Sequence, residues 1–413
     1  MKLRGLLAIT ALLMSLFSAT PGVAKNQAGD LFSNESISQI TITISNGSAA
    51  KLAVAPKVSV PGRFKITNKS GTLNYKNIPI DFHLKGTSTL RQNPSLTANR
   101  PSLRVKFKQD GILDIPFFGS MNSLTLNAMT TDESKIHEYT AYKLYNAMGV
   151  PAPRVGYAKV TVIIGGRSYD KGLFAIIEPY DDAFLETRFQ TRTQHLYEPC
   201  GHWTDVTRPG TSKGGKDCVN TVFEVKEGWK NTPNKLDLRA LSAIQKLPSR
   251  KEWWAAMDRY TDRDELIRMW AVDNFISAWD SYSGSIINNY YLRSDVMGVF
   301  TMLPTGTDET FEYNYPMDAT SIGYPLIYDD FKVQSKGRGI MFTKCLQYKP
   351  CLNDYLDALK AVKLKAKEID ITGQIDQISS TLNGTPTWSQ IAVKNWIAMK
   401  GKEVDGLLRK YGR

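Results

Sequence analysis

The sequence predicts an α+β protein with a strand-rich N-terminal lobe and a helix-rich C-terminal lobe. Short β-prone runs alternate with turn residues from about residue 39 to residue 180. From residue 181 onward, apolar residues recur mostly at helical spacing. The chain has 413 residues, 42% of them hydrophobic, and can bury a large core in one elaborate catalytic domain or in two tightly joined lobes. We therefore expect lobes over residues 39–180 and 181–413.

The first lobe is expected to hold a mainly antiparallel sheet. Its first predicted strands cover residues 41–46, 63–67, 80–86, 102–107 and 123–129. A helix follows, with Asp132 or Thr131 as its N-cap and Gly149 at its end, before Pro151. Two more predicted strands form a hairpin around a Gly-Gly turn and cover residues 156–166 and 171–180.

The second lobe is expected to be mostly helical. The predicted helices cover residues 181–189, 236–247, 250–259 and 262–279, with further helices in the last hundred residues. Three strands are predicted among them, within 220–228, near 288–293 and near 299–303.

The first 24 residues have the features of a secretory signal peptide. Lys2 and Arg4 precede an apolar run, and small residues then lead to a plausible cleavage point after Ala24. The run is too short for a good membrane span, and no later stretch approaches the ~20 apolar residues that a span needs. We therefore expect export to the periplasm, the cell surface or the medium, with residues 25–38 as a flexible lead-in.

The chain is basic, with a formal charge of +12. Removal of residues 1–24 takes away two cations and no acid, and this lowers the charge to +10. A basic protein can bind phosphates or anionic envelopes, but scattered lysines are also typical of an ordinary solvated surface. Nucleic acid is not an expected partner, because no nucleic-acid-binding motif is present.

Four cysteines, an even number in an exported chain, predict two disulfides. Of the three possible pairings we favour the two local ones, Cys200–Cys218 and Cys345–Cys351. Zinc binding is the competing interpretation, but the spacing matches no common zinc site and only His202 lies near a cysteine.

Three local patterns suggest phosphate chemistry. The first is the Gly/Ser/Thr turn "LKGTSTLRQNP", with Gly86 and Ser88, followed by a strand that carries Arg104 and Lys106. Backbone amides of such a turn can hold a phosphate while a cation on the next strand neutralises it. The turn is not a Walker loop, and taken alone the pattern favours a polar hairpin turn with solvent-facing cations.

The second pattern is "VDNFISAWDSYSGSIINNYYL", in which a long helix leads to Asp280 in a loop and Asn289 opens a strand. The third is "FTMLPTGTDETF", in which a strand leads to Asp308. Two carboxylates at separate strand and helix ends, with Asn289 as a further oxygen ligand, suit Mg²⁺ that is also bound by substrate phosphates. Alternatively, Asp280 caps a turn, Asn289 binds backbone and Asp308 is an ordinary turn residue.

Read together, five segments in order resemble the CotH kinase family, a spore-coat-protein-H-like group of secreted, atypical protein kinases. The similarity runs from about residue 80 to about residue 360. Its segments are "LKGTSTL…NRPSLRVKF", "DESKIHEYTAYKLYNAMG", "GLFAIIEPYDDAFLETRF", "DSYSG…NNYYL" and "FTMLPTGTDETF". The resemblance implies a two-lobed, distantly protein-kinase-like fold that transfers the γ-phosphoryl group of ATP to Ser or Thr hydroxyls of an exported protein, with Mg²⁺ or Mn²⁺.

The resemblance also implies roles for particular residues. Asp308 would be the metal-binding aspartate, Asp280 the loop aspartate near the transferred phosphate, and Asn289 its polar neighbour. Lys106, or else Arg104, would be the strand cation that touches phosphate.

Two glutamates receive roles in the same way. Glu138 would be the helix partner of the strand cation, and Glu178 would lie at the lobe hinge near adenine. The chain departs from the family pattern at Thr305 and Gly306, where many members have Trp and Asp, and at His137 and Phe174, where Arg and Tyr are usual. These departures leave Asp280 and Asp308 in place.

Two other function classes are open. The chain can be a structural protein of the envelope or surface that keeps the fold without phosphoryl transfer, because export separates it from the cellular ATP supply. Its aromatic content and basic charge also fit a polysaccharide-binding or polysaccharide-hydrolysing protein, although no pair of carboxylates can be assigned as acid and base.

Overall fold

The computed structural model describes residues 29–33, 35–86, 90, 95–108, 121–208, 218, 221–228, 234–284, 286–312 and 338–413. The predicted signal peptide, residues 1–24, lies outside this part of the chain. Within the predicted lead-in, the 3-10 turn η1 (Gly29–Phe32) places Leu31 in the core, 1% exposed. Part of the lead-in therefore packs against the fold.

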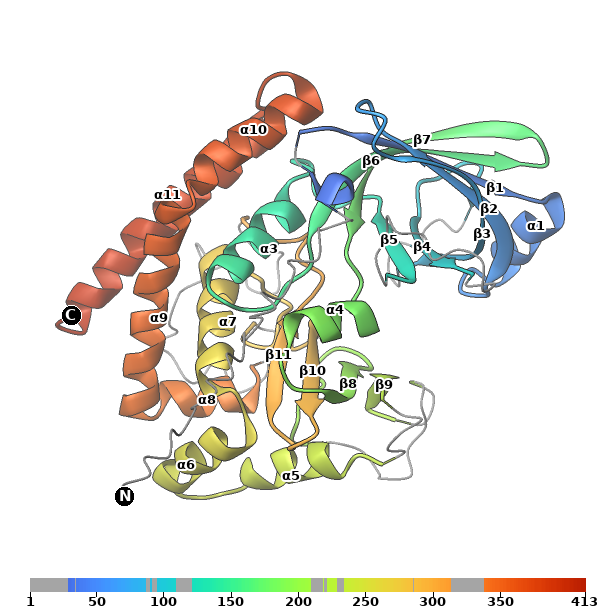
Figure 1. Ribbon diagram of the computed structural model, residues 1–413. Coiled ribbons are helices and arrows are strands. Elements are labelled where there is room, and N and C mark those ends of the chain that lie inside the picture. The colour runs from blue at the N-terminus through green and yellow to red at the C-terminus, as the bar shows by residue number, and fades with distance from the viewer. Residues whose placement is uncertain are drawn as a thin grey trace, which may run out of the picture.

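Seven strands of the N-terminal part close into a barrel (Figure 1). In barrel order they are β1 (Ser38–Ile44), β2 (Val60–Thr67), β3 (Asn74–Lys85), β4 (Ser102–Phe107), β5 (Ser123–Asn127), β7 (Arg167–Ile177) and β6 (Val155–Ile164). The pairs are antiparallel, as expected, except that β1 pairs with β6 in parallel, with Ser38 opposite Ala158. That pairing closes the barrel, a feature that the strand pattern did not predict.

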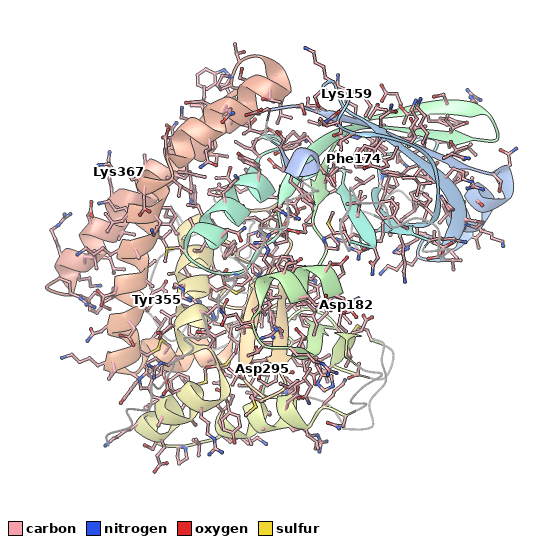
Figure 2. The ribbon with its side chains drawn as sticks, viewed as in Figure 1. Lys159, Phe174, Asp182, Asp295, Tyr355 and Lys367 are labelled. Atoms are coloured by element: carbon pink, nitrogen blue, oxygen red, sulfur yellow. A yellow bond between two sulfur atoms is a disulfide. The ribbon has the colours of Figure 1, made fainter. Side chains whose placement is uncertain are left out.

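The alternation of side chains along β3 and β4 separates the core from a polar outer face. Phe82 and Val105 point inward and are fully buried, as is Phe174 of β7 (Figure 2). Their neighbours His83 and Arg104 lie opposite each other on the other face, because successive side chains of a strand point to opposite sides. The barrel therefore presents its β3 and β4 cations outward.

The helical part has its own four-stranded sheet, in the order β11 (Phe300–Pro304), β10 (Tyr290–Asp295), β8 (Thr193–Pro199) and β9 (Phe223–Glu227). Its helices are α4 (Asp182–Arg188), α5 (Leu236–Ile244), α6 (Arg250–Tyr260), α7 (Arg263–Ile276), α8 (Ile340–Leu346), α9 (Lys349–Glu368), α10 (Ile371–Asn383) and α11 (Trp388–Lys410). Two further helices belong to the N-terminal part, α1 (Asn46–Val54) and α3 (His137–Ala147).

Helix α7 is the centre of the second core. It is buried along most of its length and packs against α3, α9, α11 and β11 (Figure 1). Among the described residues, no helix is long and apolar enough to cross a membrane.

The predicted elements are found with shifted ends, and two were missed. Helix α3 begins at His137, not at Asp132 or Thr131. Asp132 remains outside the helix and accepts hydrogen bonds from the backbone amides of Lys135 (2.9 Å) and His137 (2.9 Å). Helix α1 and strand β8 were not expected, because the short segments that form them have no clear periodicity.

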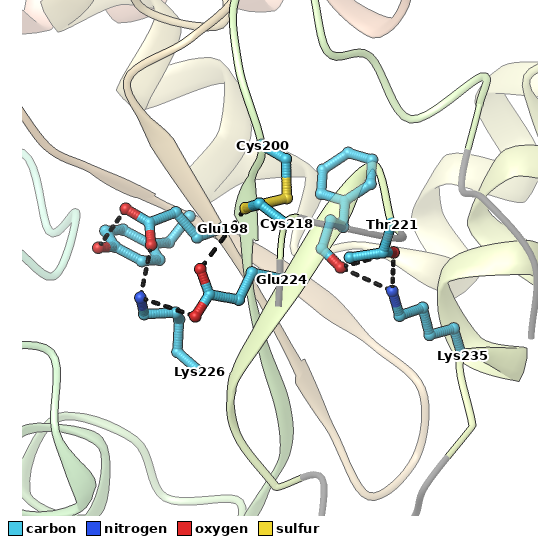
Figure 3. The surroundings of a disulfide bond; sticks show 9 residues. Glu198, Cys200, Cys218, Thr221, Glu224, Lys226 and Lys235 are labelled. Atoms are coloured by element: carbon cyan, nitrogen blue, oxygen red, sulfur yellow. Dashed lines mark hydrogen bonds and ion pairs between the residues drawn. A yellow bond between two sulfur atoms is a disulfide. The ribbon is translucent and has the colours of Figure 1, made fainter. Parts of the chain in front are cut away.

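Both predicted disulfides are confirmed. Cys200 pairs with Cys218 and Cys345 with Cys351, with Cα atoms 5.3 and 5.0 Å apart. Figure 3 shows the first bridge beside an ion pair in which Lys226 binds Glu198 at 2.8 Å. The bridge therefore ties the end of β8 to the loop that leads into β9.

Candidate functional site

The loop after α7 is folded around Asp280. Ser277 ends the helix in the left-handed region, at φ 57°. The backbone oxygen of Asp280 accepts hydrogen bonds from the amides of Asn288 (3.0 Å) and Asn289 (2.7 Å), so the chain returns to the point where it left the helix. This return places the side chain of Asn289, at the start of β10, against Asp280.

Asn289 joins this loop to the loop after β11. Its amide nitrogen donates to a carboxylate oxygen of Asp280 and, at 3.1 Å, to the backbone oxygen of Gly306. Gly306 has φ 61°, and a Cβ atom there would lie 2.4 Å from the Asn289 amide nitrogen. Only glycine satisfies both the backbone angle and the close approach. The structure therefore brings Asp280, Asn289 and the Asp308 loop together.

The buried carboxylate of Asp273 binds the loop that contains Asp280. Asp273 of α7 accepts hydrogen bonds from the hydroxyls of Tyr145 (2.5 Å) and Ser283 (2.8 Å). Burial raises the pKa of Asp273 to about 6, and the two hydroxyls oppose that rise. Asp273 thus links α3, α7 and the Asp280 loop, a role that the sequence pattern did not reveal.

Asp308 is half-buried and is held by the segment that precedes and begins α3. The hydroxyl of Thr131 donates to its carboxylate at 2.9 Å, and Nδ1 of His137 donates to its backbone oxygen at 2.8 Å. Neither residue was a predicted site residue. Their spacing from Asp308, 177 and 171 residues, explains why no local pattern could find them.

Burial and the negative charges of neighbouring acidic residues raise the pKa values of Asp280 and Glu138. Burial, followed by the charges of Asp308 and Glu309, raises the pKa of Asp280 well above its usual value. Burial and the charge of Asp308 raise the pKa of Glu138 to about 8, whereas Lys85 and the hydrogen bond from Asn127 lower it. A divalent cation would relieve this repulsion.

These oxygen ligands would suit Mg²⁺ or Mn²⁺ if the phosphates of a nucleotide supplied the remaining ligands. Within the described ranges, no three His, Cys, Asp or Glu side chains form a metal-binding group. The chain would offer Asp280 and Asp308, whose charges act on each other, whereas Asn289 turns its amide nitrogen, not its oxygen, toward Asp280. Mg²⁺ is commonly bound in this way, through one or two carboxylates plus phosphates and water.

The structure does not bring the predicted strand cations to Glu138. Arg104 donates to the hydroxyls of Thr125 (2.8 Å) and Ser123 (2.9 Å) on the neighbouring strand. Lys106 is exposed and its charge acts on Glu227 of β9. The cation whose charge acts on Glu138 is Lys85, at the end of β3.

The remaining predicted residues are Glu178, Gly86 and Ser88. Glu178 follows β7, and its carboxylate binds Arg154 at 2.6 Å and Arg188 at 3.2 Å, so both oxygens are occupied. Gly86 follows β3 directly, at φ 117°. Ser88 lies outside the described residues.

One of three comparisons with known proteins covers the segments that carry these residues. The family model described as CotH kinase protein matches residues 82–402. Among solved structures, that of the Helicobacter pylori proinflammatory kinase CtkA matches with 12% identity over 75% of this chain and 89% of the other, at a TM-score of 0.32, too low to support an argument. No curated protein matches. Because the family match spans well over half of its length, this chain belongs to the CotH kinase family.

Proposed function

We propose that this chain is an exported, ATP-dependent protein kinase that transfers the γ-phosphoryl group to Ser or Thr hydroxyls with the help of Mg²⁺ or Mn²⁺. Family membership supports kinase-type activity in general, and the hydroxyl specificity, the metal and the export are our proposal. The main structural support for this proposal is that the side chain of Asn289 contacts both Asp280 and the backbone of Gly306, which precedes Asp308.

Asp308 and Asp280 would hold the divalent cation, which when bound supplies positive charge to the β- and γ-phosphates. Thr131 and His137 fix the side chain and the backbone of Asp308, respectively. This restraint supports catalysis because phosphoryl transfer depends mainly on positioning and charge neutralisation.

Asp280 would also orient the incoming hydroxyl group. Its carboxylate would accept the hydroxyl proton as the new bond to phosphorus forms. Lys85 is the cation that we place on the phosphates instead of Lys106, since Glu138 lies within the range of its charge. Arg104 remains a second candidate on the same outer face of the barrel.

The proposal also covers the adenine site near Glu178 and the compartment in which the protein acts. Glu178 marks the passage from β7 to α4, where we place adenine, and its carboxylate pairs with two arginines. The two disulfides support an oxidising compartment after export. The substrate would then be another exported or surface protein.

The test is phosphoryl transfer from γ-labelled ATP, with Mg²⁺ or Mn²⁺, to the protein itself and to a generic Ser/Thr substrate. We expect transfer by the wild type and at least a 100-fold loss in Asp308→Ala. Asp258→Asn, a change at an exposed aspartate of α6, is the control and should keep the wild-type rate. Transfer that survives in Asp308→Ala would refute the site, and no transfer by the wild type would favour a structural role.

A further inference from the structure

The C-terminal helix α11 contacts the segment that holds Asp308. Gln390, in the first turn of α11, is completely buried. Its side-chain nitrogen donates to the backbone oxygen of Ser134 at 3.0 Å, across 256 residues of sequence. Its side-chain oxygen accepts from the backbone amide of Thr387 at 2.9 Å. These two partners fix the orientation of the amide, because only its nitrogen can donate.

A continuous series of hydrogen bonds leads from Ser134 to Asp308. The hydroxyl of Ser134 donates to Asp132 at 2.6 Å. Asp132 accepts from the backbone amide of His137 at 2.9 Å, and Nδ1 of His137 donates to the backbone oxygen of Asp308 at 2.8 Å. The side chain at the start of α11 is therefore connected to the backbone of the proposed metal-binding residue.

The segment between Thr131 and His137, which we call the α3 leader, is held by other parts of the fold, among them the hydroxyl of Tyr157, which donates to the backbone oxygen of Lys135 at 2.7 Å. Lys135 has φ 63°, in the left-handed region that non-glycine residues seldom adopt. The N-cap of α3 is Ile136, which makes no side-chain capping bond. A strained segment persists only when its surroundings determine it, and Gln390 supplies such a restraint from α11.

Helix α11 is itself anchored to the core of the helical part. The indole nitrogen of Trp396 donates to the backbone oxygen of Phe275 at 3.0 Å, at the end of α7. Figure 1 shows α10 and α11 running along the side of α3 and α7 that faces away from the barrel. The anchor means that Gln390 holds the α3 leader against the same helix that delivers Asp280.

We propose that α11 acts as an intramolecular clamp and that Gln390 is a positioning residue, which fixes the α3 leader and through it Asp308. The kinetic part of this inference rests on the proposed kinase function. The structural part, that Gln390 restrains the α3 leader, does not.

The test compares two substitutions that weaken the start of α11 in different ways. Gln390→Met keeps the length of the side chain but removes the donor to Ser134. Thr387→Ala removes the hydroxyl that caps the amide of residue 390, at 3.3 Å, but keeps the Thr387 backbone amide that orients Gln390. The alanine variant therefore lowers helix stability while leaving the clamp in place.

Two readouts are needed, namely amide hydrogen exchange in residues 131–138 and steady-state phosphoryl transfer. We expect Gln390→Met to exchange about tenfold faster and to lose about tenfold in kcat, a ratio that corresponds to about 1.4 kcal/mol, with less than a twofold change in the KM for ATP. Thr387→Ala should lower the Tm without either change.

Unchanged exchange in Gln390→Met, or equal effects in both variants, would overturn the clamp. If the wild type transfers no phosphate, the kinase proposal fails, and the exchange comparison alone then decides whether Gln390 restrains the α3 leader.

Discussion

Glu138 gives a prediction in which the free energy can be worked out. This residue of α3 is 6% exposed, and its carboxylate accepts a hydrogen bond from Asn127 at 2.8 Å. Burial, together with the nearby charge of Asp308, raises its pKa from the usual 4.5 to about 8. The substitution Glu138→Gln keeps the size of the side chain and an acceptor for Asn127, and it removes the charge.

The direction of the pH dependence of the free energy of unfolding follows from proton binding by Glu138. Between pH 4.5 and pH 8 the folded protein retains a proton on Glu138 that the unfolded chain has lost, so the free energy of unfolding falls as the pH rises through this range. At about 1.4 kcal/mol for each pH unit, the loss between pH 4.5 and pH 7 is about 3 kcal/mol. Glu138→Gln should not show this loss.

The assay is urea unfolding of both proteins at pH 4.5 and pH 7, in a chelator that removes divalent metal. The variant's advantage over the wild type should grow by about 3 kcal/mol between the two pH values. Glu368→Gln, at a glutamate with a 63% exposed side chain on α9, is the control and should change little. An advantage that is the same at both pH values would refute the assignment of a raised pKa to Glu138.

Two further predictions concern the barrel cation and the first disulfide. Lys85→Met should lower kcat/KM for phosphoryl transfer by about 100-fold, whereas Lys106→Met should change it less than about threefold; the reverse order would restore Lys106 as the phosphate cation. Replacing Cys200 and Cys218 by serine should lower the free energy of unfolding by about 3 kcal/mol, as expected for a loop of 18 residues, and an unchanged Tm would contradict this.

Residues that form the site within one stretch of chain were predictable. Asp280 and Asn289 lie nine residues apart on either side of one loop, and Asp308 follows the next strand, so local patterns singled them out, and the family resemblance then suggested their roles.

Residues that reach the site across the fold were not predictable. Lys85 and Lys106 are both cations on the outer face of the barrel, and only the position of α3 decides which of them acts on Glu138. Gln390 lies far beyond the segments that carry the family resemblance in the sequence. Barrel closure was missed for the same reason, because parallel pairing between distant strands leaves no local signal.

The parallel partner of β1 has a consequence for the order of folding. β1 pairs with β2 after a connection that contains α1, but Ser38 faces Ala158, which is 120 positions later in the chain. Loop closure over that distance is slow, and until it occurs the uncharged, isoleucine-rich strand Ser38–Ile44 has one side of unpaired backbone groups. Such a strand is a template for pairing with another unfinished copy. The first strand of the barrel thus waits for a partner farther along the chain than any other barrel strand does.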